Sequence, residues 1–219
     1  MIGRKLISDE ATIVVLGRFN PSIFQPQWFA RYKLLRDGEV NSATVKFIDN
    51  SFSLFSTEWF TLQVISEQFF LSTKDPSKFL LARDLVAGTF GLLSHTPVVK
   101  FGLNRLQKYE CEQEEEWHKI GHILAPKNMW EGVMTGPGLK LIQMEGSRPD
   151  SRADKVFVRL GPIDRPRVFF VHTNQHYDLD KESVSEPVED FQRYIATEWE
   201  SFLDYSNQVP GALLDQGSR

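Results

Sequence analysis

The feature that most limits the possible folds is a pair of segments in which apolar residues recur at helical spacing, each preceded by several strand-like runs. The apolar stripes are Phe79, Ala82, Val86, Phe90 and Leu93 in the first segment, and Phe191, Ile195, Trp199 and Phe202 in the second. A helix with such a stripe has to bury it against another element, and the strand-like runs provide one sheet face for both helices. The sequence therefore predicts an α+β fold.

The strand-like runs are rich in β-branched and aromatic residues, and they fall into two groups. In the first half they span residues 11–19, 42–48, 50–56 and 59–73, with a short helix at about 27–35. In the second half they span 97–111, 138–146, 155–162 and 167–179, with a short helix around residue 118, and the long helix at about 187–207 follows. Each half therefore predicts a strand, a short helix, an antiparallel meander and a long helix.

We expect these two pseudo-repeats to form one curved sheet with helices on one face. The expected halves are residues 1–95 and 96–208, and a flexible C-terminal tail follows at 209–219.

This order of elements, over roughly residues 10 to 207, resembles that of the TATA-box-binding protein family. In that family two similar halves fuse into one curved sheet with helices on its convex side. The resemblance is one of topology, and no DNA-inserting phenylalanine pair can be matched here, so none of the family's binding residues is transferred. The chain is also similar to short, uncharacterised bacterial proteins found in multi-gene and phage-defence settings, which implies a role in a larger assembly.

Composition narrows the class of protein further. Hydrophobic residues make up 41% of the 219 residues, enough for a substantial core, and the formal net charge of −4 lacks the basic balance typical of sequence-independent nucleic-acid binding. Cys111 is the single cysteine, so no internal disulfide can form. There is no signal-like segment and no run of about eighteen apolar residues. We expect a cytoplasmic protein with no membrane segment and no cofactor.

Two histidine pairs are the candidate metal ligands. His118 and His122 stand four residues apart in the HKIGH motif of a short helix, and His172 and His176 stand four apart on the last strand. Helical angles place the first pair opposite the apolar residues of its helix, so both imidazoles should face solvent. Lys119 occupies the position where the zincin motif requires glutamate. A metal-dependent enzyme that brings the two pairs together is one alternative, and hydrogen-bonded or solvated histidines are the simpler interpretation.

The sequence offers little else for catalysis. It contains no nucleophile elbow, P-loop, dinucleotide-binding glycine motif or C-x-x-C. Cys111 lies between Glu110 and Glu112, whose negative charge disfavours a thiolate. We assign no catalytic residue and favour a protein that is not an enzyme.

Charge is unevenly distributed along the chain. Residues 147–167 include six basic and three acidic residues, whereas 178–204 include nine acidic and two basic ones. The basic run is a candidate surface for nucleic-acid phosphate, although an ordinary solvated surface explains either run. The residues of this nucleic-acid alternative are Arg148, Arg152, Lys155, Arg165 and Arg167.

The short helix near residue 30 has more aromatic side chains than one buried face of its length needs. Trp28 and Tyr32, interleaved with Arg31 and Arg36, are the candidate partner-binding residues, and core packing is the alternative. We therefore expect a non-catalytic binding or adaptor protein that contacts a protein partner or forms a homo-oligomer. The alternatives are a nucleic-acid-binding module, using the curved sheet or the 147–167 patch, and the metal-dependent enzyme.

Overall fold

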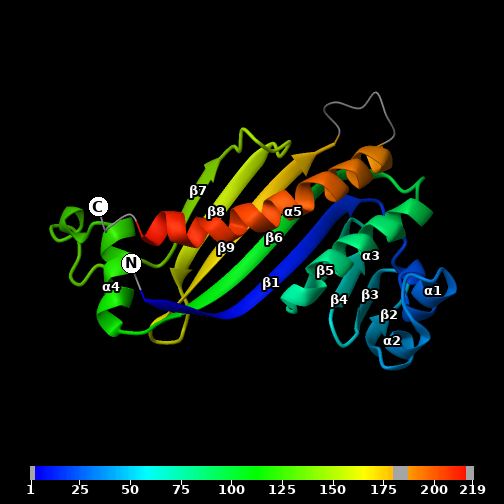
Figure 1. Ribbon diagram of the computed structural model, residues 1–219, viewed down its shortest axis with the longest axis horizontal. Helices are drawn as coiled ribbons and strands as arrows, with labels where there is room; N and C mark the ends of the chain where they lie inside the picture. The colour runs from blue at the N-terminus through cyan, green and yellow to red at the C-terminus, as the bar shows by residue number, and fades with distance from the viewer. Residues whose placement is uncertain (1–2, 180–186, 216–219) are drawn as a thin grey trace.

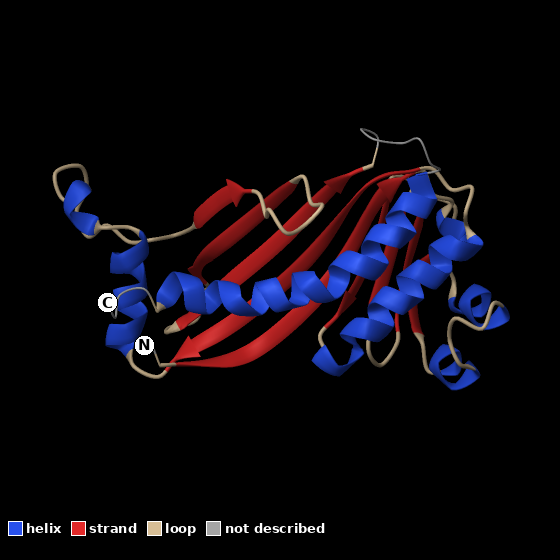
Figure 2. Ribbon diagram, turned by 45° about the horizontal axis from the view of Figure 1, so that its top comes forward, coloured by secondary structure: helices blue, strands red, loops and turns tan. Residues whose placement is uncertain are grey.

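The computed structural model describes residues 3–179 and 187–215, and its centre is a nine-stranded antiparallel sheet (Figures 1 and 2). The strands are β1 (Arg4–Gly17), β2 (Thr44–Ile48), β3 (Phe52–Ser56), β4 (Thr61–Ile65), β5 (Gln68–Thr73), β6 (Val98–Cys111), β7 (Ile142–Gly146), β8 (Lys155–Pro162) and β9 (Val168–Asp178). The helices are α1 (Pro26–Arg31), α2 (Asp37–Asn41), α3 (Phe79–Leu92), α4 (Glu114–Leu124) and α5 (Pro187–Leu214). The predicted α+β class is confirmed.

The strand order is β2-β3-β4-β5-β1-β6-β9-β8-β7, and every pairing is antiparallel. The two long strands β1 and β6 are therefore neighbours at the centre, and the shorter strands run outward from them. The described strands at the two edges, β2 and β7, each pair on one side only.

Helices α3 and α5 lie side by side on one face of the sheet (Figure 2). The predicted stripe of α5, namely Phe191, Ile195, Trp199 and Phe202, is completely buried there. On the sheet, Ala11, Ile13 and Val15 of β1 face the same core, because alternate residues of a strand point to the same side.

A polar belt divides this core into two clusters. Arg105 of β6 binds Asp9 of β1 through two hydrogen bonds, Nε–Oδ1 at 2.9 Å and Nη2–Oδ2 at 2.6 Å, and it also donates to α5 at the Leu203 carbonyl and the Ser206 hydroxyl. A larger cluster that includes Trp199 lies on one side of the belt, and a smaller one around Tyr109 and Val209 lies on the other. The bidentate pair therefore ties the two central strands to the longest helix.

Four boundaries differ from the sequence prediction, each for a local reason. The first strand starts at Arg4, well before residue 11, because its polar first part pairs with β6 alone. The expected helix at 27–35 ends at Arg31, since Lys33 takes a left-handed conformation with φ of 58°, and a separate α2 follows. Strand β7 starts at Ile142 and not at 138. The expected tail from 209 is wrong as far as Leu214, because α5 continues and buries Val209 and Leu214.

Candidate functional site

The aromatic segment predicted to bind a partner is only partly used by the core. Phe24 and Phe29 are fully buried, whereas Trp28 is half-buried and Tyr32 is 44% exposed. The rings of Trp28 and Tyr32 lie 5.0 Å apart, and the Arg31 guanidinium lies 5.9 Å from the centre of the Tyr32 ring. Trp28, Tyr32 and Arg31 thus form a small aromatic and cationic surface beside the core.

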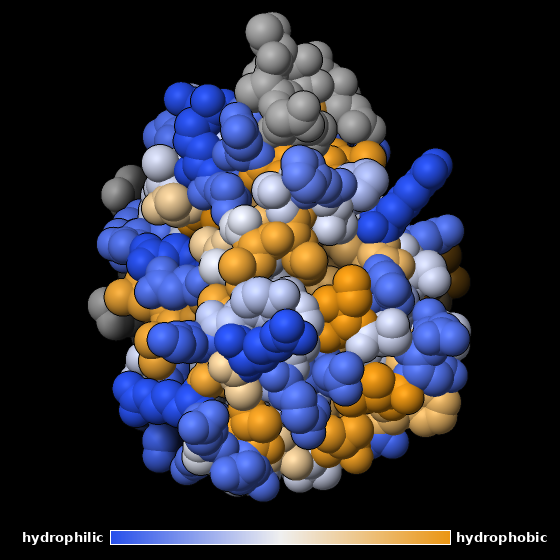
Figure 3. All heavy atoms as spheres, turned by 90° about the vertical axis from the view of Figure 1, so that its right-hand side faces the viewer, coloured by the Kyte–Doolittle hydropathy of each residue, from blue (hydrophilic) through white to orange (hydrophobic). Residues whose placement is uncertain are grey.

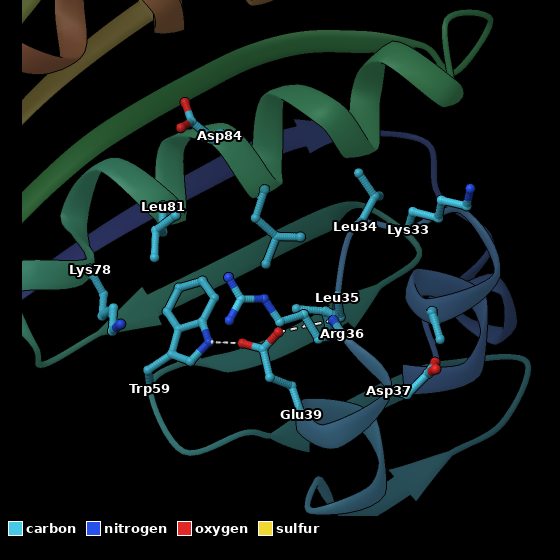
Figure 4. Close-up of a pocket in the computed structure, with 12 residues that line it drawn as sticks. Lys33, Leu34, Leu35, Arg36, Asp37, Glu39, Trp59, Lys78, Leu81 and Asp84 are labelled. Atoms are coloured by element: carbon cyan, nitrogen blue, oxygen red, sulfur yellow. Dashed lines mark hydrogen bonds between the residues drawn. The ribbon is translucent and has the colours of Figure 1, made fainter.

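A groove of about 650 Å³ opens next to this surface, between α2 and α3 (Figure 4). It is lined by Ala30, Lys33, Leu34, Leu35, Arg36, Asp37, Glu39, Trp59, Lys78, Leu81, Asp84 and Leu85. Arg36, one of the candidate partner-binding residues, lies in the middle of the groove, with Lys78 toward one end and Lys33 toward the other (Figure 4). The groove therefore combines residues from three separate stretches of the chain, 30–39, 59 and 78–85.

Glu39 fixes the shape of this groove. One of its carboxylate oxygens accepts a hydrogen bond from Trp59 Nε1 at 2.7 Å, and the other accepts from the backbone N–H of Arg36 at 3.0 Å. The second bond satisfies a free N–H at the start of α2, where a carboxylate also interacts favourably with the helix dipole. Glu39 thereby joins α2 to the β3–β4 turn and holds the indole of Trp59 in the wall.

Three cations line the groove together with three carboxylates, those of Asp37, Glu39 and Asp84. Lys33, Arg36 and Lys78 form no ion pair with any of the residues that the structure describes. The nearby Asp84 is bound by Arg83 at 2.8 Å, and both oxygens of Glu39 accept hydrogen bonds. The groove is therefore able to receive anionic groups from outside.

Apolar side chains stand exposed along the same groove. Leu81 of α3, which lines the groove, and its neighbour Leu80 are each 47% exposed, although their positions in the sequence had suggested burial. The half-buried Leu34 and Trp59 line the groove from the other side. Figure 3 views this end of the molecule and shows hydrophobic side chains at the surface between hydrophilic ones.

The five basic residues of the nucleic-acid alternative do not gather on one face. Arg148 is buried against α5, where it donates to Ser201 and lies 4.4 Å from the centre of the Tyr205 ring, and Asp150 pairs with it at 2.5 Å. Arg152 lies over the Tyr194 ring, and Lys155 pairs with Glu145 on the opposite sheet face. Arg165 and Arg167 are at the β8–β9 turn, bound to the Glu110 carboxylate and the Glu112 carbonyl, respectively.

The two histidine pairs lie on separate elements. His118 and His122 are exposed on α4, as expected, and His118 lies 3.5 Å from Glu114. His172 and His176 lie on the helix-free face of β9, where burial, with a smaller contribution from Arg159, lowers the pKa of His172. Within residues 3–179 and 187–215, no three His, Cys, Asp or Glu side chains are grouped so as to hold a metal ion.

The helix-free face of the sheet carries a row of uncharged polar side chains. Registered pairs place Thr61, Ser72, Thr12, Asn104 and Asn174 side by side on five adjacent strands, β4, β5, β1, β6 and β9. Asn174 Nδ2 donates to Asn104 Oδ1 at 2.7 Å, so the two central amides are joined. No helix of the described chain covers this row (Figures 1 and 2).

No protein-family model matches the chain, and no curated protein is significantly similar to it in sequence. Among the described helices, none is both long enough and apolar enough to cross a membrane. The fold and site together define an α+β protein with an open antiparallel sheet and, at one end, a groove lined by three cations, three carboxylates and apolar side chains.

The sequence had identified Arg36 but not Trp59, Lys78 or Leu81, which complete the groove. These residues are brought together only by the fold. The sequence pattern that could have indicated an exposed apolar surface on α3 is the pair Leu80 and Leu81, which widens the apolar stripe of this helix beyond what one buried face requires.

Proposed function

We propose that this protein is a non-catalytic binding protein that holds a segment of a partner protein in the groove between α2 and α3. The observation that carries the proposal is the set of three cations, Lys33, Arg36 and Lys78, that have no ion-pair partner within the described chain. Exposed apolar side chains beside unpaired charges are typical of surfaces that select a partner by charge and hold it by apolar burial.

The partner segment that fits this groove combines acidic with apolar side chains. Its carboxylates would face Arg36 and the two lysines, and its apolar side chains would cover Leu81, Leu34 and Trp59. Arg31 and Tyr32 stand in the sequence between Ala30 and Lys33 of the groove, so the partner segment would extend from the groove to the aromatic surface of Trp28, Tyr32 and Arg31. A larger bacterial assembly, such as a defence system, is the setting we propose from the resemblance stated for the sequence.

A selection from a random peptide library displayed on phage tests this proposal, because it does not require the natural partner. The expected peptides are enriched in Asp or Glu together with Leu, Phe or Trp. Neutralising two cations, as Arg36→Gln with Lys78→Gln, should weaken their binding by about tenfold. Lys33→Gly removes the third charge and places glycine at a left-handed backbone position, which glycine adopts without steric strain. This variant should therefore bind more weakly without being less stable.

Lys119→Gln is the matched control, because it removes one positive charge from the exposed face of α4 at the other end of the molecule. Its affinity for the selected peptides should equal that of the wild type. Peptides that lack acidic residues, or that bind the Arg36→Gln, Lys78→Gln variant as tightly as the wild type, would refute the proposal.

A second candidate function is nucleic-acid binding on the helix-free face of the sheet. It is supported by the row around Asn104 and Asn174, whose amides can bond to base edges, and by Phe70 and Phe170 on the same face, which can stack on bases. Salt-dependent binding of DNA or RNA that is lost in Asn104→Ala, Asn174→Ala would support it. Absence of binding at low salt would eliminate it.

We also propose that the two halves of the chain are copies of one structural unit, as in TATA-box-binding proteins. The support is the strand order, in which the first strand of each half, β1 or β6, lies at the centre and the last strand of each meander, β5 or β9, lies next to it.

A further inference from the structure

The two edges of the sheet are protected very differently against pairing with another strand. Natural edge strands are usually blunted by a bulge or by a charged residue such as lysine. Strand β2 has both features, because its register with β3 shifts between Val45 and Phe47 and Lys46 stands at the shift. Strand β7 has no bulge, since it pairs with β8 without interruption from Ile142 to Gly146, and it has no lysine.

Strand β7 also carries no free charge. Its single charged residue is Glu145, and Lys155 of β8 neutralises this carboxylate at 2.5 Å. Met144 is 65% exposed on the face that carries α5, since that helix passes over other strands and leaves β7 uncovered (Figure 1). The outer edge of β7 therefore pairs with no strand of the described chain, and it lies beside an exposed apolar side chain.

A cluster of exposed apolar side chains, Trp130, Met134 and Leu141, adjoins the start of this strand. Met129, Val133 and Met144, close to them in the sequence, are exposed as well. Trp130, Met134 and Leu141 share a groove of about 320 Å³ with Ile142, the first residue of β7. Flexible methionines beside a tryptophan are common at protein-binding surfaces, because they adapt their shape to a partner.

We propose that β7 pairs antiparallel with the β7 of a second copy of this chain, so that two nine-stranded sheets join into one. In a register centred on Met144, this residue lies opposite Met144 of the second copy, and Gln143 lies opposite Glu145. No like charges meet, and the two methionines cover each other. A five-residue strand pair alone is marginal, and the apolar cluster next to it supplies the further area that a stable dimer needs.

Gly161 holds this surface in place. A Cβ atom at position 161 would lie 2.6 Å from the Lys140 carbonyl oxygen, so only glycine lets residues 140 and 141 cross so close to β8. The crossing sets Leu141 beside the start of β7. The position of the proposed dimer surface therefore depends on glycine at position 161.

Sedimentation velocity of the full chain, at concentrations up to about 200 µM, tests the proposal. The expected result is a reversible dimer of the 25.2 kDa chain. Met144→Lys places two like charges opposite each other and should raise the dimer dissociation constant by at least about tenfold. Val45→Lys is the matched control, since Val45 is 48% exposed on the other edge, and this variant should dimerise like the wild type.

Two rescue measurements separate pairing from loss of folding. A mixture of Met144→Lys and Met144→Glu chains should form a heterodimer, because opposite charges then face each other. Met144→Cys should form an intermolecular disulfide, since directly opposed residues of antiparallel strands have Cα atoms about 4.5–5.5 Å apart. A chain that stays monomeric throughout, a dimer that tolerates Met144→Lys, or a dimer equally sensitive to Val45→Lys overturns the proposal. Binding of a different protein at β7 by a monomeric chain would do the same.

Discussion

Replacing Arg105 by alanine is expected to lower the free energy of unfolding by about 3–5 kcal/mol, because the Asp9 carboxylate then stays buried without its cation. The side chains of Arg105 and Asp9 are only 7% and 6% exposed, so water cannot take the place of the missing guanidinium. The Ser206 hydroxyl and the Leu203 carbonyl lose a donor as well, although Ser206 still donates to that carbonyl at 2.9 Å.

The matched comparison removes both charges. In the double variant Asp9→Leu, Arg105→Met, apolar side chains of similar size replace the pair, no buried charge is left, and the Leu203 carbonyl keeps its bond from Ser206. Its unfolding free energy should lie within about 1–2 kcal/mol of the wild type, since an apolar replacement of a buried pair is often close to neutral. Measured against the single variants Asp9→Leu and Arg105→Met, each expected to cost about 3–5 kcal/mol, the coupling between the two positions should be at least about 4 kcal/mol.

Urea unfolding followed by circular dichroism gives these free energies directly, and for a chain of this size the single variant should melt roughly 6–20 °C lower. Two results would show that the reasoning is wrong. A cost below about 1 kcal/mol for Arg105→Ala would mean that the pair is effectively solvated. A double variant as unstable as the sum of the two single ones would mean that the positions act independently.

Three further outcomes test the packing and the titration of single residues. Gly17→Ala should destabilise the fold by about 2 kcal/mol or more, since its Cβ would lie 2.1 Å from the Pro97 carbonyl oxygen. Gly38→Ala is the control, because the space around Gly38 is open, and it should be neutral or stabilising. Equal melting temperatures of the two variants would contradict this. Burial raises the pKa of Cys111 to about 11, so the thiol should resist alkylation at pH 8.5 until urea unfolds the protein, and rapid modification of the native state would refute its burial. The pKa of His172 is lowered from 6.5, so the stability that its neutral form contributes is complete above pH 6.5 and is lost as the pH falls through the lower folded value. His172→Gln should therefore reduce the loss of unfolding free energy at acid pH. An unchanged loss would argue against the shift.

The sequence was sufficient for the element order because the core-facing residues repeat at helical or strand spacing. In α5, Phe191, Ile195 and Trp199 are the residues that the period selects, and all three are fully buried. Periodicity could not find the polar half of β1, where Arg4 to Asp9 pair with a strand about a hundred residues later. It also overestimated the burial of α3, because Leu80 and Leu81 are exposed and Leu81 lines a groove that exists only once α2 has folded.

Charge counting was the weaker guide to the site. Arg148 contributes to the basic run in the sequence, but it pairs with Asp150 and packs on Tyr205 of α5, so it is a structural residue in the fold. Arg36 was selected for its aromatic neighbours, and its place in the groove depends on Glu39 and on Trp59 from another element. A linear sequence gives the number of charges, whereas their pairing depends on contacts that form only in three dimensions.

The two proposed surfaces lie at opposite ends of the sheet, and this has a consequence for affinity. The groove belongs to the part of the molecule that contains β2 to β5, whereas β7 is the far edge strand. A dimer formed through β7 therefore leaves both grooves open and gives each assembly two equivalent binding sites.

Binding to a surface that displays many copies of a peptide should then be at least about tenfold tighter than binding to the same peptide free in solution. Met144→Lys should abolish that difference while leaving the affinity for the free peptide unchanged. Arg36→Gln with Lys78→Gln should weaken both and preserve the ratio between them. An avidity that persists in Met144→Lys would show that the two grooves are not joined through β7.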